Sequence, residues 1–344
     1  MTDLQILTAR DVPLGGLRAM NVRRTLPHRD RSFVGAWCFL DHYGPQVVGA
    51  GNDGGMDVAP HPHIGLQTVS WLFEGEIEHR DSGGVHAIVR PGEVNLMTAG
   101  HGIAHSEVST AATRTLHGVQ LWVVLPDSDR DVTRRFDHHT PAPVSLADGA
   151  ATARVFLGRI DGVDESPVTT HTPLLGAQLD LEPGAVVEIP LDVAFEHAVL
   201  LDVGDVTLTA GNDASADTPL AFGDLACLDP GLERLVLRAG DDGARVLLLG
   251  GEPFEEDIIM WWNFVGRSHE EIAEFRDAWE ASSSRFGVVE GYVGETERIP
   301  APPLPGVRLK SRGRRGRVRT TRTEGDSQTA ATPTHAPDRD ASVH

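Results

Sequence analysis

The chain has 344 residues, enough for two domains of ordinary size with cores of their own. Hydrophobic residues make up 40% of it, and its 37 glycines and 22 prolines indicate a globular, turn-rich, largely β protein. Its two cysteines, Cys38 and Cys227, both stand among apolar residues, which favours buried free thiols and gives no indication of a disulfide framework or a thiolate metal site.

The formal net charge of −20 is unevenly distributed along the chain. Residues 308–344 hold nine basic and four acidic side chains, so the preceding 307 residues carry a net charge of −25. Nucleic acid is therefore not expected as a ligand, because binding phosphates needs a basic face, except through this basic tail. No apolar stretch approaches the length of a membrane span and no leader pattern is present, so we expect a cytoplasmic protein without membrane contact.

The first part of the chain, residues 1–135, predicts a β-barrel. A lead-in to about residue 58 contains short strand candidates, and closely spaced apolar runs separated by turn signals follow from residue 67. Such a succession of short strands is the signature of a β-sandwich or barrel. The strand candidates are 18–24, 33–40, 69–73, 86–89, 94–97 and 119–125.

Two pairs of metal-capable residues fall within this part of the chain. His61 and His63 are two residues apart, and so are His105 and Glu107. On β-strands the members of each pair point to the same face, because the side-chain period is two. Two neighbouring strands would therefore aim three imidazoles and one carboxylate at one point. Pro62 favours an edge strand, since it cannot donate a ladder hydrogen bond.

The ligand types narrow the choice of metal. Three neutral imidazoles and one carboxylate suit a borderline divalent ion and do not suit calcium or magnesium. Iron, nickel, copper, manganese and zinc all meet this description. A six-coordinate ion held by four protein ligands keeps two positions open, which suggests binding of substrate or oxygen. His79 and His101 are close in sequence to the pairs and are candidates for a supporting role.

A second series of strand candidates fills residues 136–290 and suggests a duplicated fold. It contains no H-x-H or H-x-E pair: His197 stands alone, and His171 lies near its start. We therefore expect a second barrel without a metal. One strong helix is predicted at 268–284, where Ser268 and Glu271 form a capping box. From about residue 300 to 344 the composition changes to Pro, Arg and Thr, which predicts a disordered basic tail.

The motifs around these residues resemble those of the pirin family, a group of bicupins. The resemblance covers roughly residues 5–290. It rests on HPHIGLQTVS at 61–70, HRDSG at 79–83 and MTAGHGIAHSE at 97–107, with FLDHYG at 39–44, HGVQLWV at 117–123 and GEP at 251–253. It implies an all-β fold of two consecutive cupin barrels, of which the N-terminal one binds a metal through His61, His63, His105 and Glu107.

The resemblance also implies a function, in two versions. Bacterial pirin-like proteins are associated with quercetin 2,3-dioxygenase activity, so the expected partners are a small aromatic substrate such as a flavonol and O2. Glu107 would then serve both as a ligand and as the base that accepts the substrate's hydroxyl proton. The alternative is a non-catalytic, redox-sensing iron protein that acts as a transcriptional co-regulator through a protein partner.

Overall fold

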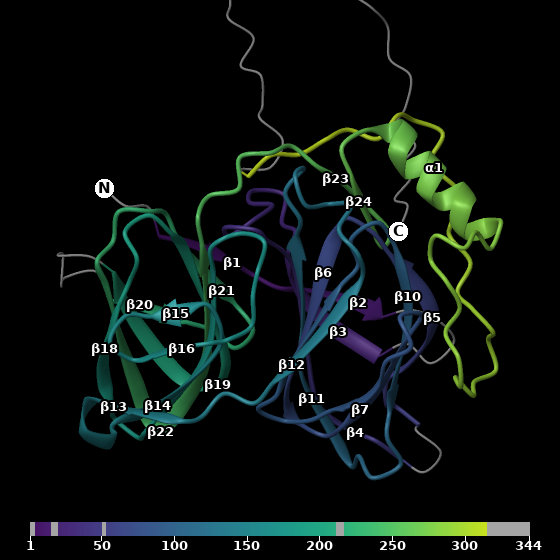
Figure 1. The fold of residues 1–344 in the computed structure, drawn as a ribbon. Coiled ribbons are helices and arrows are strands. Elements are labelled where there is room, and N and C mark those ends of the chain that lie inside the picture. Colours follow the sequence, from purple (N-terminus) through teal and green to yellow (C-terminus); the bar gives the residue numbers. More distant parts are fainter. Residues whose placement is uncertain (1–3, 15–19, 50–52, 211–216, 315–344) are drawn as a thin grey trace, which may run out of the picture.

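Two β-barrels lie side by side in the computed structural model, which describes residues 4–14, 20–49, 53–210 and 217–314 (Figure 1). Strands dominate both barrels, and the described residues form one α-helix, α1 (His269–Glu280). The predicted all-β architecture of two cupin barrels is confirmed. No helix in the described ranges is long and apolar enough to span a membrane.

The first barrel is built from a seven-stranded and a four-stranded antiparallel sheet. The larger sheet has the spatial order β12 (Arg135–His139), β9 (Val94–Thr98), β6 (Leu66–Glu74), β11 (Thr115–Val124), β4 (Trp37–Val47), β3 (Met20–Leu26) and β2 (Arg10–Leu14). The smaller sheet has the order β5 (Asp57–His63), β10 (Ile103–Ser109), β7 (Ile77–Asp81) and β8 (His86–Val89). β5 is thus an edge strand, as Pro62 indicated.

The second barrel centres on a nine-stranded antiparallel sheet. Its main path is β1 (Gln5–Leu7), β21 (Leu225–Leu228), β19 (Glu196–Ala210), β22 (Arg234–Gly251), β17 (Leu174–Leu181), β14 (Ala151–Leu157) and β13 (Val144–Leu146). β18 (Val186–Pro190) pairs with β22, β20 (Thr218–Leu220) pairs with β19, and β15 (Arg159–Ile160) forms a separate ribbon with β16 (Asp164–Glu165).

Three segments lie on the barrel opposite to the one expected from the domain limits 1–135 and 136–290. One is β12, which pairs with β9 in the first barrel although it runs to His139. β1 pairs with β21 in the second barrel, where Leu7 is buried. The chain after β22 returns to the first barrel: β23 (Ile259–Trp261), β24 (Phe264–Gly266) and α1 share a core with Ile64 and Ala104. The domain limits themselves stay a prediction, but each barrel is completed by chain from beyond its limit.

A continuous apolar core joins the two barrels. Trp71 of β6 stacks on Phe156 of β14 with ring centroids 4.6 Å apart, and its indole nitrogen donates to Gln178 Oε1 at 2.8 Å. Gly35 has φ of +52°, and a Cβ there would lie 2.6 Å from the Cα of Gly251, so the two backbones meet at a point where only glycine fits. Buried side chains of both barrels therefore form the contact between them.

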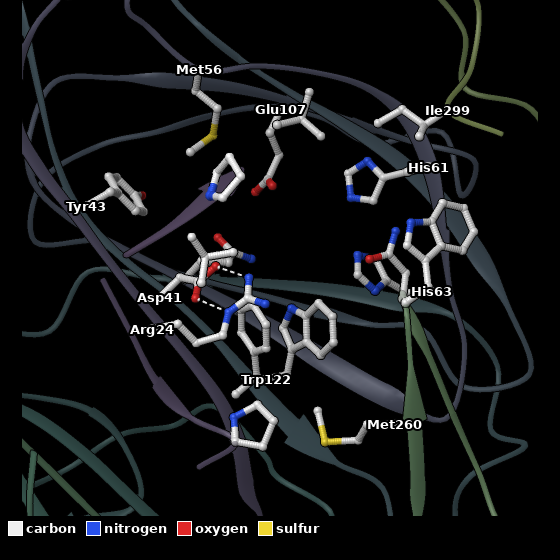
Figure 2. A pocket seen from close by; sticks show the side chains of 18 residues that line it. Arg24, Asp41, Tyr43, Met56, His61, His63, Glu107, Trp122, Met260 and Ile299 are labelled. Carbon is white, nitrogen blue, oxygen red and sulfur yellow. Dashed lines mark hydrogen bonds and ion pairs between the residues drawn. The ribbon is translucent and has the colours of Figure 1, made fainter. Parts of the chain in front are cut away.

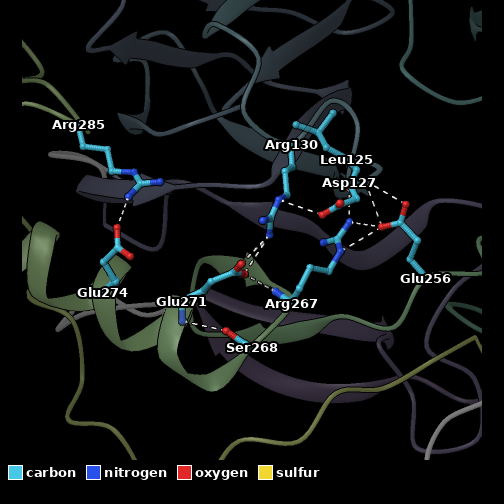
Figure 3. Close-up of polar contacts among 9 residues, drawn as sticks. All are labelled: Leu125, Asp127, Arg130, Glu256, Arg267, Ser268, Glu271, Glu274 and Arg285. Carbon is cyan, nitrogen blue, oxygen red and sulfur yellow. Dashed lines mark hydrogen bonds and ion pairs between the residues drawn. The ribbon is translucent and has the colours of Figure 1, made fainter.

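The helix α1 begins at the predicted capping residue. The Ser268 hydroxyl accepts a hydrogen bond from the Glu271 amide at 3.2 Å, and the Glu271 carboxylate binds Arg130 at 3.0 Å (Figure 3). The helix ends at Glu280, four residues earlier than predicted, because Ser282 takes a left-handed φ of +53° and its amide donates to the Trp279 carbonyl. This turn closes the helix end as a Schellman motif does.

The predicted disorder from residue 300 is wrong for residues 300–314. Ala301 is buried, its amide donates to Glu280 Oε1 at 2.8 Å, and Arg312 forms a β-bridge with Ile258. Arg308 also pairs with Glu270 of α1. The Pro- and Arg-rich segment 300–314 therefore forms no core of its own and packs against the core that α1 shares with the first barrel. Residues 315–344 lie outside the described ranges, so the prediction for them is untested.

Candidate metal centre

The predicted ligand pairs lie on adjacent strands. β5 and β10 pair antiparallel with His105 opposite His61 and Ile103 opposite His63. A register shift follows between His105 and Glu107, so that Glu107 pairs with Val58. Two steps along β10 here match three along β5, so the extra residue lies in β5, while β10 keeps a regular register with β7 from His105 to Glu107. The two pairs therefore come together as the period-two argument predicts, and β10 itself is regular between His105 and Glu107.

The three imidazoles converge on one point. Their ring centroids are 4.3 to 5.1 Å apart, and one nitrogen of each lies within 4.8 Å of the others. All three side chains are buried, yet His63 Nδ1 and His105 Nε2 have no hydrogen-bond partner among the described residues. Buried polar atoms are rarely left unpaired. Converging, unpaired imidazole nitrogens fit a divalent transition-metal ion.

Glu107 stands somewhat apart from this group. Its carboxylate points into the cavity beside His61 (Figure 2), and one of its oxygens lies within 4.8 Å of ligand atoms of His79 and His105. The Ser70 hydroxyl lies 3.3 Å from Glu107 Oε1. Glu107 is thus placed where it could reach either an ion or a substrate.

A layer of hydrogen bonds orients the imidazoles. His61 Nδ1 donates to the Ala59 carbonyl at 2.9 Å, which leaves Nε2 as the nitrogen with a free lone pair. His79 lies behind His105, with 3.4 Å between their Nδ1 atoms, and its Nε2 is 3.3 Å from Asp81 Oδ2. His79 therefore supports the site, whereas His101 faces the Val132 carbonyl and takes no part in it.

Burial sets the charge of these groups. It lowers the pKa of His61 to about 4 and, together with the neighbouring histidines, holds the pKa values of His63 and His105 well below the usual range. Burial raises the pKa of Glu107. Near neutral pH the three imidazoles are therefore uncharged, which is the form that binds metal ions.

A cavity of about 430 Å³ opens beside the imidazoles (Figure 2). This volume is typical of sites for small organic ligands. Trp122 and Phe39 stack with centroids 4.1 Å apart to form an aromatic wall, and the Arg24 guanidinium lies 4.3 Å above the Phe39 ring. The lining residues are Val12, Pro13, Arg24, Pro27, Phe39, Asp41, Tyr43, Met56, Val58, His61, His63, Glu107, Gln120, Trp122, Met260, Trp262, Asn263 and Ile299.

Sequence reasoning missed two parts of this cavity. Arg24 and the buried Asp41 form a two-bond ion pair on its wall, with distances of 2.6 and 2.7 Å, but only the register of β3 and β4 brings them together. The other missed part is the cover. Met260 and Trp262 of the β23–β24 hairpin and Ile299 of the following segment line the cavity, and nothing in the sequence links them to residue 61.

A second histidine cluster lies between the barrels. Asp202 of β19 accepts hydrogen bonds from His42 Nε2 at 2.6 Å and His117 Nε2 at 2.7 Å, and it pairs with Arg245 at 2.5 Å. Arg23 Nε donates to His42 Nδ1 at 3.5 Å, so His42 carries its proton on Nε2. Every group has a hydrogen-bonding role, and we read the cluster as a polar link between the barrels.

The fold and the site together define a class. Two cupin barrels in tandem, with a buried imidazole triad opening onto a cavity in the first, make the protein a bicupin. Comparison with known proteins gives the family. The Pirin profile matches residues 18–123, and the profile of the Pirin C-terminal cupin domain matches residues 176–287. The chain belongs to the pirin family.

Individual relatives share most of the chain. A Pseudomonas aeruginosa protein, whose name assigns it provisionally to quercetin 2,3-dioxygenase, is 45% identical over 302 residues, 88% of this chain and 91% of its own. A pirin-like protein of Caulobacter vibrioides is 37% identical over 88% of this chain and all of its own. A crystal structure of quercetin 2,3-dioxygenase from Acinetobacter baumannii matches with a TM-score of 0.81 at 39% identity, covering 90% of this chain and 97% of that chain.

Proposed function

We propose that this pirin-family protein is a metal-dependent dioxygenase that cleaves a flavonol such as quercetin with O2 and releases carbon monoxide. The observation that carries the proposal is the convergence of His61, His63 and His105 on one point, with His61 and His63 in the wall of a cavity of about 430 Å³. The names of the Pseudomonas and Acinetobacter relatives support the same reaction.

His61, His63 and His105 would hold the ion, with Glu107 as a fourth ligand. We propose iron(II), and nickel, copper, manganese, cobalt or zinc would also accept this donor set. The bound ion would act as a Lewis acid on the 3-hydroxyl oxygen of the flavonol and would enable the reaction of the substrate with O2.

The remaining roles fall to side chains of the cavity. Phe39 and Trp122 line the cavity with aromatic side chains, which suits contact with an aromatic substrate. Glu107 projects into the same space and would accept the proton of the 3-hydroxyl on a carboxylate oxygen. Met260 and Trp262 also line the cavity and would help to exclude water from the reacting ring.

Oxygen uptake by anaerobically iron-loaded protein given quercetin tests the proposal, with metal content measured in parallel. We expect turnover in the wild type and loss of both turnover and metal in His63→Ala and His105→Ala. His138→Ala is the matched control, because that side chain is 45% exposed and lies outside the cavity.

The outcomes separate the two functions. Iron that binds through these residues without oxygen uptake, for any flavonol supplied, would refute the dioxygenase reading. The redox-sensing co-regulator would then be the hypothesis to pursue, through a search for a protein that binds one oxidation state only.

A further inference from the structure

A second cavity, of about 470 Å³, lies in the second barrel and is lined by residues of β15, β16 and the end of β18. It is separate from the cavity of the metal centre and shares no lining residue with it. Its walls combine polar and apolar side chains, and Pro167, Pro190, Leu191 and Phe195 belong to the apolar part. Its volume is in the range of sites for small organic molecules.

His197, at the start of β19, lines this cavity with an unpaired imidazole. The side chain is buried, with 1% of its surface exposed, and neither ring nitrogen has a hydrogen-bond partner among the described residues. Burial lowers the pKa of His197 to about 4, so the ring is neutral at pH 7. A neutral imidazole offers one donor and one acceptor. A ligand group that both donates and accepts a hydrogen bond would therefore suit His197.

Several other polar groups of the cavity are already paired. The Ser166 hydroxyl donates to the Phe156 carbonyl at 2.8 Å, and the Thr170 hydroxyl donates to the Thr172 carbonyl at 2.7 Å. Asp192 accepts from the Ala194 amide at 2.9 Å. The hydroxyl protons of Ser166 and Thr170 are therefore engaged within the protein, whereas both ring nitrogens of His197 stay open to a polar group of a ligand.

Charge at the cavity disfavours anions. Asp161, Glu165 and Asp192 line it together with a single cation, Arg159, which already pairs with Asp161 at 3.2 Å. A carboxylate or phosphate would meet this net negative charge with no free cation. The faces of Pro167, Pro190 and Phe195 instead suit a flat, uncharged ring.

We propose that the second barrel binds a small uncharged phenol in this cavity, with the phenolic hydroxyl hydrogen-bonded to His197. Such a site is independent of the metal centre and of the proposed dioxygenase reaction. It gives the barrel without a histidine triad a ligand-binding role of its own.

The test is an NMR titration of the full-length, metal-loaded protein, labelled with ¹³C in its histidine rings, with 4-fluorophenol. The His197 ring resonance is identified by its absence from His197→Phe. We expect a saturable shift of this resonance with a dissociation constant in the millimolar range. Fluorobenzene, which lacks the hydroxyl, should bind about tenfold more weakly. His86→Phe, an exposed histidine of the first barrel, is the control variant and should bind as the wild type does.

Three results would overturn the proposal. One is the absence of a saturable shift of His197, which would mean that the cavity holds water only. Another is equal affinity for fluorobenzene, and the third is undiminished binding, followed by ¹⁹F NMR, in His197→Phe. If this variant does not fold, the comparison of the two ligands on the wild type decides. Oxygen uptake with quercetin is measured on the same samples, and its presence or absence leaves the conclusion on His197 unaffected.

Discussion

Glu107 differs from the three histidines in its surroundings. The imidazoles meet one another, whereas the Glu107 carboxylate faces the cavity and lies near Ser70, which is 3.3 Å from its Oε1. A carboxylate in this position can act on a substrate proton without being needed to hold an ion. A single substitution at Glu107 can therefore distinguish a metal ligand from a proton acceptor.

Replacing Glu107 by Gln should separate these roles. We expect at least about a 100-fold fall in kcat, because a positioned general base contributes that much or more. Metal content should stay within about twofold of wild type, since three imidazoles remain. Glu74→Gln, at the exposed end of β6, is the control. Unchanged kcat in Glu107→Gln would show that another group takes the proton.

Single residues were predictable from the sequence where one strand decides their direction. His61 with His63, and His105 with Glu107, follow from the two-residue period alone, and the β5–β10 pairing joins them. The Arg24–Asp41 pair depends on which strands become neighbours. No local pattern encodes that choice, so this wall of the cavity could not be predicted.

Among the elements, the segment from β23 to residue 314 has the widest effect on the site. It places Met260, Trp262 and Ile299 on the cavity and packs α1 against the first barrel. The Ile299 amide donates to the Pro60 carbonyl at 2.8 Å, next to His61. The helix was predictable because its cap and its apolar face are local in sequence. Its docking site was not, because that depends on contacts with residues some 200 positions earlier.

The cap of α1 makes a local prediction. Ser268→Ala removes the acceptor for the Glu271 amide and should lower the free energy of unfolding by about 1 kcal/mol. Ser284→Ala, an exposed serine beyond the helix, should change it by less than about 0.5 kcal/mol. Urea unfolding followed by tryptophan fluorescence measures both. Equal effects would contradict the capping role.

Truncation tests the role of the segment from β23 to residue 314. A chain ending at residue 297 loses the Ile299 contact, the buried Ala301 and the Arg298 cation that lies 4.8 Å above the Trp279 ring. We expect a several-fold higher KM for quercetin and a loss of at least about 2 kcal/mol of stability. A chain ending at residue 314 keeps these contacts and should match the wild type. If both truncations behave alike, the segment does not shape the site.

The whole molecule is held together by buried apolar and polar contacts between the barrels. The Asp202 cluster spans both barrels, with His42 and His117 on one side and Arg245 on the other. Burial alone would raise the pKa of Asp202, but the hydrogen bonds from His117 and His42 and the charge of Arg245 hold it well below its usual range. The duplication of the fold was predictable from the repeated strand series, and this interface was not.

Acid should weaken the link between the barrels. A carboxyl group with a lowered pKa stabilises the folded state fully above its unfolded pKa of about 3.9, and this stabilisation is lost as pH falls through the lower folded value. Asp202→Asn should cost about 3 kcal/mol at pH 7, and the difference from wild type should shrink below about pH 4. Asp205→Asn, exposed on the same strand, should cost little. Unfolding at several pH values measures this, and a constant difference would refute it.

β1 belongs to the second barrel, and the segment from β23 to residue 314 belongs to the first. This arrangement has a consequence for recombination between relatives. A chimera of two pirin relatives joined only near residue 136 would pair the first barrel of one parent with the cavity cover of the other. Its second barrel would also have β1 of the other parent as an edge strand. Exchanging a barrel as a working unit therefore takes three crossovers, and variation in substrate choice can enter through residues 258–301 while the histidine triad stays as it was.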